Sequence, residues 1–398
     1  MSHVYGIDAG TTSSAIAVGL DDGTVLRVKD PGSAHGSVSS ASSACVLRNG
    51  TVAVGAAAEA VRIARAEHYW SEFKREFATP VTRMLGGRHR SAADLTTELL
   101  AFLRREAGRR VPGEPEAVVV TVPVSWERGR RELMTSVLAA SGFTAGRIEL
   151  RDEPVAAAAH VLGRNPDVGP TLVYDLGGGT FDCAVVRPSP GGIEVLGRPG
   201  GLPDVGGSGF DRLLLRHVAT VFPREWEKLT AQADSDATLL RGRRRLLDAC
   251  RTVKVQLSVV DTHEEYLPDL GPDVVLEMTR RQLDDLLRPA LAATLAECER
   301  MLGELALTWG DIDRILPVGG STRLPAVNDL LRLGTGRPIL PVGDPDLATV
   351  HGAVDLARGL IEPPAPQPVP EPEPEPDPEP APLARRPSVY RPEASPFD

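Results

Sequence analysis

Residues 172–186 read LVYDLGGGTFDCAVV, an apolar run that is interrupted by three consecutive glycines and then continues. Residues 4–18, VYGIDAGTTSSAIAV, follow the same order: an apolar run, Asp-x-Gly, small residues and a second apolar run. When Asp8 is aligned with Asp175, Gly10 coincides with Gly177. Glycines at such a turn let backbone N–H groups converge on an anion such as a phosphate. The sequence therefore predicts two similar phosphate-binding hairpins in one chain.

The spacing of the two hairpins indicates a duplicated fold. Asp8 and Asp175 are separated by about half the length of residues 1–361, where short β-rich runs alternate with amphipathic helices. Residues 116–123, EAVVVTVP, are typical of a strand that is covered on both faces. We therefore expect an α/β protein with two similar lobes that hold one polyphosphate between them.

Several helices have recognisable ends. We expect Ser125 to cap a helix that runs to about Ala140. Pro154 is expected in the first turn of a helix that ends at Gly163. A last helix is expected over about residues 346–360, where the globular pattern ends.

Beyond Ile361 the composition changes abruptly. Residues 362–398 alternate proline with carboxylates and carry eight Asp or Glu against three Arg. Such a segment cannot bury a core, so we expect an extended, disordered acidic tail that recruits a protein partner. The sequence thus predicts a globular domain over residues 1–361 and a tail over residues 362–398.

Composition argues against several classes of protein. The 398-residue chain has a formal net charge of −10, which argues against a general nucleic-acid-binding protein. It contains no uninterrupted apolar run of about 18 residues and no secretory signal pattern, so we expect neither a membrane span nor export. The four cysteines are far apart in the sequence, as expected of reduced thiols in a cytoplasmic protein.

The side chains around the two hairpins suit a phosphate that is bound together with a metal ion. Thr11, Thr12 and Thr180 place hydroxyl donors beside the glycines. Asp8 and Asp175 precede the turns, where carboxylates can hold Mg²⁺ directly or through its water molecules.

Two further glycine turns occur later in the chain. The first, RILPVGGSTRLPAV (314–327), would let a flat base or ribose approach Gly319 and Gly320. Its polar or stacking partners would be Ser321 and Arg323. The second, DVGGSGFD, offers another anion-binding turn. The sequence has no Gly-Lys dipeptide, which excludes a P-loop, and no G-x-G-x-x-G that opens a helix.

Together these segments resemble the ATPase domain of the heat-shock protein 70 family (DnaK-type chaperones), within the superfamily that includes actin and sugar kinases. GIDAGTTSS and VYDLGGGTFDCAV resemble the family's phosphate motifs, RDEPVAAAAHVLG a connecting segment and ILPVGGSTRLP its adenosine motif. The resemblance covers residues 3 to about 361. It implies a duplicated actin-like (ribonuclease H-like) fold with two lobes around a nucleotide cleft, and slow, Mg²⁺-dependent hydrolysis of ATP to ADP and phosphate.

The resemblance also assigns roles to individual residues. The implied catalytic residues are Lys74, Glu153, Asp175, Thr180 and Asp182, and the implied metal-side carboxylates, acting through water, are Asp8 and Asp175. The residues implied to bind ATP or ADP are Asp8, Gly10, Thr11, Thr12, Gly177, Gly178, Gly179, Thr180, Gly206, Gly207, Lys254, Ser258, Gly319, Gly320, Ser321, Arg323 and Asp346.

The sequence also departs from the family pattern. Arg251 occupies the position of a glutamate that binds the ribose in many members. Val255 occupies the position of a frequent basic residue that stacks on adenine, so the binding of adenine is expected to differ. The family continues into a peptide-binding domain, whereas no alternating strand pattern follows Ile361. We therefore expect the ATPase domain without a peptide-binding domain.

Several functions are compatible with this pattern. The first is an ATP-hydrolysing protein that takes part in protein folding, or a nucleotide-gated interaction module, with a co-chaperone or nucleotide-exchange protein as partner. The alternatives are an actin-like filament-forming ATPase and a small-molecule kinase of the same superfamily. The segments DEPVAAA and GGSTRLP favour the first interpretation.

Overall fold

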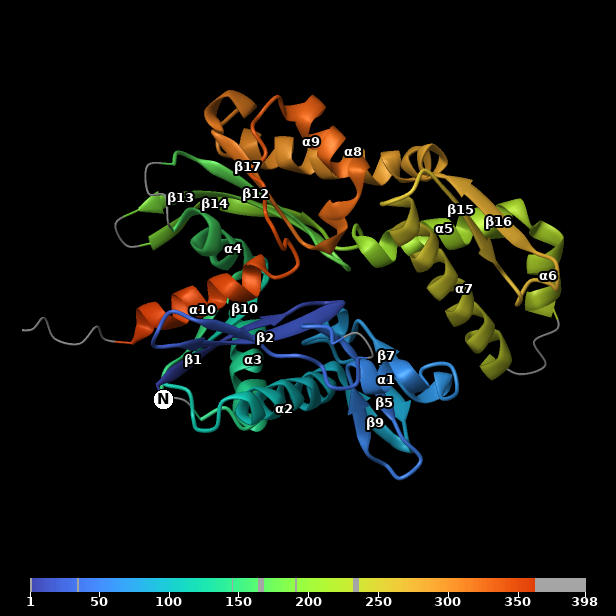
Figure 1. Ribbon diagram of the computed structural model, residues 1–398, viewed down its shortest axis with the longest axis horizontal. Coiled ribbons are helices and arrows are strands. Elements are labelled where there is room, and N and C mark those ends of the chain that lie inside the picture. The colour runs from blue at the N-terminus through green and yellow to red at the C-terminus, as the bar shows by residue number, and fades with distance from the viewer. Residues whose placement is uncertain are drawn as a thin grey trace, which may run out of the picture. The chain divides into compact units, whose positions relative to one another are not determined.

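Two β-sheets repeat one strand pattern (Figure 1). The first contains β1 (His3–Ala9), β2 (Ser13–Leu20), β3 (Val25–Arg27), β10 (Ala117–Val122) and β11 (Ile148–Asp152), and the short strand β4 (Ser40–Ala41) pairs with β2 beside this path. The second contains β12 (Thr171–Leu176), β13 (Phe181–Ser189), β14 (Gly192–Leu202) and β17 (Arg314–Val318). Their orders are β11-β10-β1-β2-β3 and β14-β13-β12-β17. β1 pairs parallel with β10 and antiparallel with β2, as β12 does with β17 and β13, so the expected duplication is confirmed.

The computed structural model describes most of the first 361 residues. The described residues are 2–33, 36–144, 146–163, 168–189, 192–231 and 236–361. They belong to one compact unit, Met1–Ile361. The Pro/Glu-rich tail expected over residues 362–398 lies outside the described residues.

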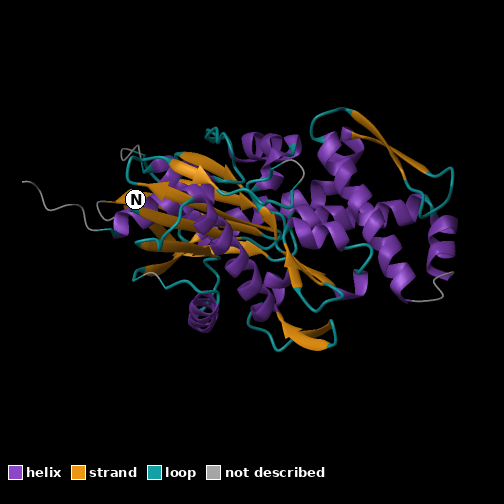
Figure 2. Cartoon of the chain, turned by 60° about the horizontal axis from the view of Figure 1, so that its bottom comes forward, coloured by secondary structure: helices purple, strands orange, loops and turns teal. Residues whose placement is uncertain are grey.

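Helices flank both sheets (Figure 2). Those beside the first sheet are α2 (Ala92–Arg110) and α3 (Arg128–Ala140), and those beside the second are α8 (Arg280–Glu304) and α9 (Pro325–Thr335). Two more helices, α4 (Glu153–Leu162) and α10 (Ala348–Leu360), pack against each other between the sheets (Figure 1). Their contact is close, because a Cβ atom at Gly352 would lie 1.7 Å from the carbonyl oxygen of Ala156. These two helices therefore join the lobes at the base of the hairpins.

Each lobe also carries an outer extension. In the first lobe it comprises β5 (Ser43–Val46), β6 (Val52–Val54), α1 (Ala56–Val61), η1 (Ala66–His68), β7 (Tyr69–Ser71), η2 (Phe73–Glu76), β8 (Thr82–Leu85) and β9 (Arg88–Ser91). In the second lobe it comprises α5 (Gly207–Val221), α6 (Pro223–Ala231), α7 (Asp236–Leu257), β15 (Thr262–Tyr266) and β16 (Val275–Thr279). Two short 3-10 turns, η3 (Trp309–Asp311) and η4 (Gly320–Arg323), flank β17.

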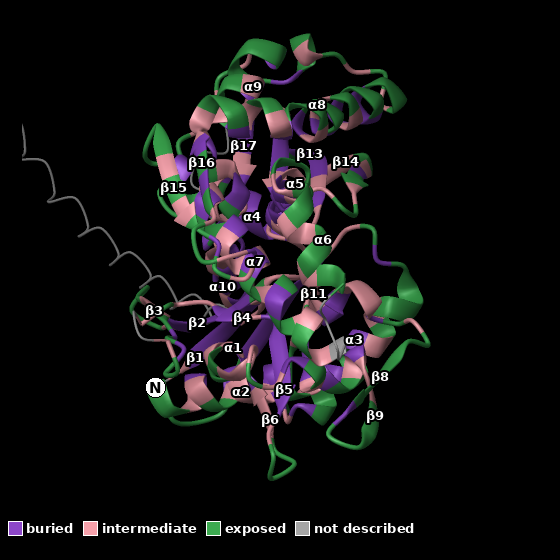
Figure 3. Ribbon diagram, turned by 90° about the vertical axis from the view of Figure 1, so that its right-hand side faces the viewer, coloured by how far each residue is buried: buried purple, intermediate pink, exposed green. Residues whose placement is uncertain are grey.

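The buried residues follow the strands of the two sheets (Figure 3). Every residue of β10 is buried, as the apolar run at 116–123 predicts for a strand that is covered on both faces. In the second sheet, β12, which corresponds to β1, is also buried except at Asp175. A polar position in an otherwise buried strand therefore marks the place where the hairpin meets the cleft.

The helix boundaries show where local patterns succeed and fail. α4 has Pro154 in its first turn and Gly163 at its C-cap, and α10 ends at Leu360, as expected. The expectation that Ser125 caps α3 is wrong, since the helix begins at Arg128. The reason is an intervening turn in which the backbone N–H of Trp126 donates to the carbonyl of Pro123 at 3.0 Å.

Two further observations concern the cysteines and the apolar content of the helices. All four cysteines are buried and unpaired. Among the described residues, no helix combines the length and the apolar content needed to cross a membrane.

Candidate functional site

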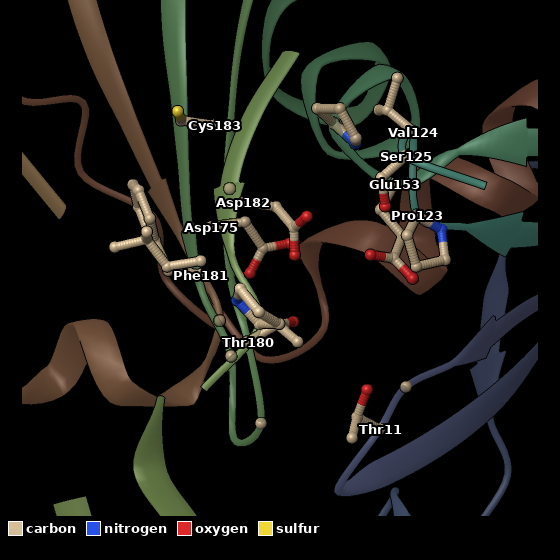
Figure 4. Close-up of a pocket in the computed structure, with 18 of the residues that line it drawn as sticks. Thr11, Pro123, Val124, Ser125, Glu153, Asp175, Thr180, Phe181, Asp182 and Cys183 are labelled. Carbon is tan, nitrogen blue, oxygen red and sulfur yellow. The ribbon is translucent and has the colours of Figure 1, made fainter. Parts of the chain in front are cut away.

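A cleft of about 1090 Å³ lies between the two glycine hairpins (Figure 4). Of the residues named from the sequence, those that line it are Asp8, Gly10, Thr11, Thr12, Lys74, Glu153, Asp175, Gly177, Gly178, Gly179, Thr180, Asp182, Gly319, Gly320 and Asp346. Figure 4 shows the carboxyl groups of Asp175 and Asp182 projecting from β12 and β13 into the cavity, with Glu153 on the facing side. Residues far apart in the sequence thus meet in one cavity.

The tips of the two hairpins touch, and glycine makes this possible. A Cβ atom at Gly178 would lie 2.5 Å from the Cβ atom of Thr12, and one at Gly179 would lie 2.6 Å from Cγ2 of Thr11. Behind them, a Cβ atom at Gly206 would lie 2.8 Å from the carbonyl carbon of Gly179. Real Cβ atoms do not approach other atoms this closely, so the three backbones can meet only without side chains at these positions.

The hairpins present hydrogen-bond donors that lack acceptors. Among the described residues, no group accepts a hydrogen bond from the backbone N–H of Thr11, Thr12, Gly178 or Gly179. The hydroxyl oxygen of Thr12 is also buried without a hydrogen-bond partner. Because buried polar groups are nearly always satisfied, these orphaned groups fit a polyanionic ligand that supplies acceptors.

Carboxyl groups gather below the hairpins. Burial raises the pKa of Asp8 to about 6 and that of Asp182 to about 7, with the charge of Glu153 as the next cause in both cases. Burial, followed by the same glutamate, raises the pKa of Asp175 well above its usual range. Lys74 opposes all three shifts but does not cancel them. Excess negative charge in a dry site favours a bound cation.

These carboxylates do not form a closed metal site by themselves. Among the described residues, no three His, Cys, Asp or Glu side chains are placed to hold a metal ion together. The hydroxyl of Thr121 donates to the Oδ1 atom of Asp8 at 3.0 Å, which orients this carboxylate. The donor set therefore fits a hydrated Mg²⁺ ion, which keeps several water ligands and takes only one or two carboxylates.

The raised pKa values predict how the ligand-free protein responds to pH. In the folded state these carboxyl groups hold protons that an unfolded Asp, with its ordinary pKa of 3.8, has released, so stability falls as pH rises from about 4 to about 7. We expect Asp182→Asn to raise the free energy of unfolding by up to about 4 kcal/mol at about pH 8, because its pKa rises from 3.8 to about 7 on folding and each pH unit of that rise corresponds to about 1.4 kcal/mol.

Denaturant unfolding with chelator present, at about pH 5 and about pH 8, checks this expectation. The gain should be small at the lower pH, where the wild-type carboxyl group is already protonated. A variant that is less stable than the wild type at the higher pH, or that gains equally at both, would contradict it.

Lys74 is held in a small, buried slot. It belongs to η2, its side chain is 7% exposed, and its Nζ atom lies 3.0 Å from the Oε1 atom of Glu153. The same ammonium lies 5.3 Å from the ring centre of Trp126, within cation–π range. This position lets a compact positive charge face the cluster of carboxyl groups at the base of the cleft.

The remaining residues implied by the resemblance lie behind the phosphate hairpins. Lys254 Nζ donates to the carbonyl of Gly207 at 2.8 Å and pairs with Asp211 at 2.6 Å. The Ser321 hydroxyl donates to the carbonyl of Gly177 at 2.8 Å. These contacts tie α5 to α7 and the second hairpin to the turn after β17.

Two side chains of this set are engaged elsewhere. The hydroxyl of Ser258 donates to the carbonyl of Lys254 within α7, at 2.9 Å. Arg323 donates to the Oδ2 atom of Asp346 from two nitrogens, at 3.0 and 2.8 Å. Neither Ser258 nor Arg323 lines the cleft, whereas Asp346 does.

Sequence reasoning missed three residues that shape the site. Trp126 packs beside Lys74, Asp211 pairs with Lys254, and Arg75 reaches across the cleft to the carbonyl of Gly179. Arg75 directly follows Lys74 and Asp211 ends the segment GGSGFD, so both were adjacent to residues already singled out. Their partners, however, lie more than 40 residues away along the chain.

Comparisons with known proteins agree with this geometry. A family model described as "Hsp70 protein" matches residues 74–361. The curated "Chaperone protein DnaK" of Thermotoga neapolitana is 31% identical over 360 residues, which is 88% of this chain and 58% of the relative. That of Thermosipho melanesiensis is 29% identical over 358 residues, with the same shares. The chain thus spans somewhat less than three fifths of the length of these relatives. With its duplicated actin-like ATPase fold, the chain belongs to the heat-shock protein 70 family.

Proposed function

We propose that this protein binds ATP together with Mg²⁺ in the cleft and hydrolyses it slowly to ADP and phosphate. The observation that carries the proposal is the pair of glycine hairpins, which meet at Thr12 and Gly178 and present N–H donors without acceptors among the described residues. A triphosphate carries the oxygens that such donors need. The similarity to curated DnaK chaperones supports the same conclusion.

The chain's own groups account for the chemistry at the phosphate end. Phosphoryl transfer depends mainly on positioning and on stabilising negative charge. The hairpin N–H groups and the Thr180 hydroxyl would hold the phosphates, and Lys74 would place its ammonium beside the transferred group. Glu153, held by its ion pair with Lys74, would orient the attacking water, with Asp182 beside it.

Asp8 and Asp175 are the residues that would hold Mg²⁺, through water molecules. The metal would neutralise charge on the phosphates during transfer. The raised pKa of both carboxyl groups supports this assignment, because a bound cation would favour the ionised carboxylates, which burial and the charge of Glu153 disfavour.

At the other end of the nucleotide, Gly319 and Gly320 would receive the adenosine, with Asp346 beside them in the cleft. Lys254 and Ser321 would support this end from behind the hairpin, whereas Ser258 and Arg323 would have to leave their present hydrogen-bond partners to contact the adenosine. Val255 is 51% exposed on α7 and offers no cation to stack on a base. We therefore propose that the phosphates contribute more to affinity than the base does, and that ATP is only weakly preferred over GTP.

We further propose that residues 1–361 act as the nucleotide-binding domain and residues 362–398 as a partner-recruiting tail. The process would be protein folding or a nucleotide-gated interaction in the cytoplasm, with a co-chaperone or nucleotide-exchange protein as partner. The named chaperone relatives support the folding role, and the net charge of −10 argues against nucleic acid as a partner.

Phosphate release from labelled ATP tests the proposed activity. We expect the purified chain to release phosphate in Mg²⁺ and to stop when the metal is chelated. Thr180→Ala, which removes one hydroxyl beside the phosphates, should lower the rate by about tenfold, the effect of losing one hydrogen bond to a charged group. Release that persists in chelator, or that is unchanged in Thr180→Ala, would argue for a contaminating enzyme and against the proposal.

A further inference from the structure

Arg75 bridges the cleft from the first lobe to the second. Its guanidinium donates to the carbonyls of Gly179 and Pro203, both at 2.7 Å, and to the Oδ1 atom of Asp204 at 3.1 Å. On its own lobe it is held by Glu72, whose Oε2 atom accepts from Nε at 2.9 Å. A single side chain thus contacts both the triple-glycine hairpin and the segment that follows β14.

The turn that carries Arg75 has an unusual backbone. Glu72 and Ala78, which flank η2, have φ values of 53° and 63°, in the left-handed region that residues with a side chain seldom adopt. Such strain persists only where surrounding contacts hold it, and it is frequent at functional sites. Between these two residues, Lys74 points to Glu153 while Arg75 points to the other lobe.

We propose that Arg75 is a cross-cleft clamp, a positioning residue whose bonds to the second lobe must break before a bound nucleotide can leave. This inference rests on the proposed nucleotide site. Gly179 lies at the tip of the phosphate hairpin, so the hydrogen bond from Arg75 to its carbonyl fixes the position of the hairpin. Because Lys74 is the adjacent residue, the same clamp also keeps the ammonium aligned with the hairpin.

The chemistry of the side chain suits this role. A guanidinium is a planar fork with several donors, so it can reach two carbonyls and two carboxylates at once, whereas an ammonium is a point charge. Asp204 is 83% exposed, so its ion pair contributes little. The hydrogen bonds to the carbonyls of Gly179 and Pro203 therefore account for most of the effect of Arg75 on nucleotide release.

The clamp is tested by measuring how fast a fluorescent ADP dissociates in Mg²⁺. We expect Arg75→Gln to accelerate dissociation on the order of 10–100-fold, since each hydrogen bond to a charged group contributes about 1.5–3 kcal/mol and 1.4 kcal/mol is tenfold. Arg75→Lys should fall between Arg75→Gln and the wild type, and Asp204→Asn should change the rate less than threefold. The control is Arg128→Gln, because Arg128 is 91% exposed and pairs with Glu132 within α3.

A second readout needs no nucleotide. Hydrogen exchange of the ligand-free protein should accelerate in Arg75→Gln over residues 177–180 and 203–208, and remain unchanged in α3 and in the control variant. Dissociation within twofold of the wild type, or unchanged exchange in these segments, would overturn the clamp. If the wild type binds no nucleotide, the proposed function fails by itself, and exchange of the ligand-free protein alone decides whether the clamp exists.

Discussion

Replacing Lys74 by alanine should lower the rate of ATP hydrolysis on the order of 10²–10³-fold, the range found when one electrostatic stabiliser of a transition state is removed. The Lys74 side chain is 7% exposed, and its ammonium pairs with Glu153 and faces the carboxyl groups at the base of the cleft. Its charge should matter most as negative charge develops on the transferred group. We therefore expect kcat to fall while the affinity for ATP changes little.

Lys74→Arg is the sharper variant, because it keeps the charge. The chain contains 44 basic residues, and only four of them are lysines, so a lysine at this position is unusual for the protein. A planar guanidinium needs more room than the slot between Glu153 and Trp126 provides, so we expect nearly the same loss as with alanine. Lys228→Arg, on the exposed surface of α6, is the matched control.

Single-turnover hydrolysis measured beside an ATP titration separates the two effects for each variant. If Lys74→Arg hydrolyses ATP like the wild type, or if the loss lies wholly in affinity, the role assigned to Lys74 is wrong.

A valine at position 178 should weaken ATP binding by about 100-fold or more. Its Cβ atom would lie 2.5 Å from both the Cβ and the Oγ1 atoms of Thr12, so the two hairpins would have to separate. Separation would remove several backbone donors from the phosphates at once, and each hydrogen bond to a charged group contributes about 1.5–3 kcal/mol. Few single substitutions should affect binding more.

The neighbouring glycine provides a comparison in the same hairpin. A Cβ atom at Gly177 would lie 3.6 Å from the carbonyl oxygen of Thr180, which is ordinary van der Waals contact. Affinity should therefore fall in the order wild type, Gly177→Ala, Gly178→Ala, Gly178→Val. Equal losses of ATP affinity in Gly177→Ala and Gly178→Ala would contradict this explanation. They would show that the chain needs glycine at these positions for backbone freedom and not for the close approach of the hairpins.

The hairpins and the duplicated sheets could be predicted because their signals are local. Asp8 and Asp175 each stand at the end of an apolar strand and directly before a glycine turn, and this order is visible in a window of about 15 residues. The register follows from the same windows, since Asp175 pairs with Asp182 across the hairpin and Asp8 with Ala15. Short-range patterns of this kind specify both the strands and the turn.

Contacts that cross the cleft could not be predicted in this way. Arg75 had no visible partner in the sequence, because Gly179 and Pro203 offer only backbone carbonyls, which any residue carries. In addition, Ser125 is a residue type typical of a helix cap, yet a competing local turn between Pro123 and Trp126 delays the helix. Packing in the folded protein determines which atoms a long side chain contacts and which of two competing local structures forms. A single sequence does not show this packing.

Calorimetric titration of the purified, nucleotide-free protein with ATP in millimolar Mg²⁺ tests the central claim most directly. The account predicts saturable binding of one ATP per chain, with a melting temperature that rises with ATP concentration by mass action. It also predicts that Gly178→Val remains folded and needs an ATP concentration about 100-fold higher or more to give either signal. An absence of binding heat and of any thermal shift in the wild type at millimolar Mg-ATP, or equal binding by Gly178→Val, would contradict the claim that the two glycine hairpins clamp a nucleotide.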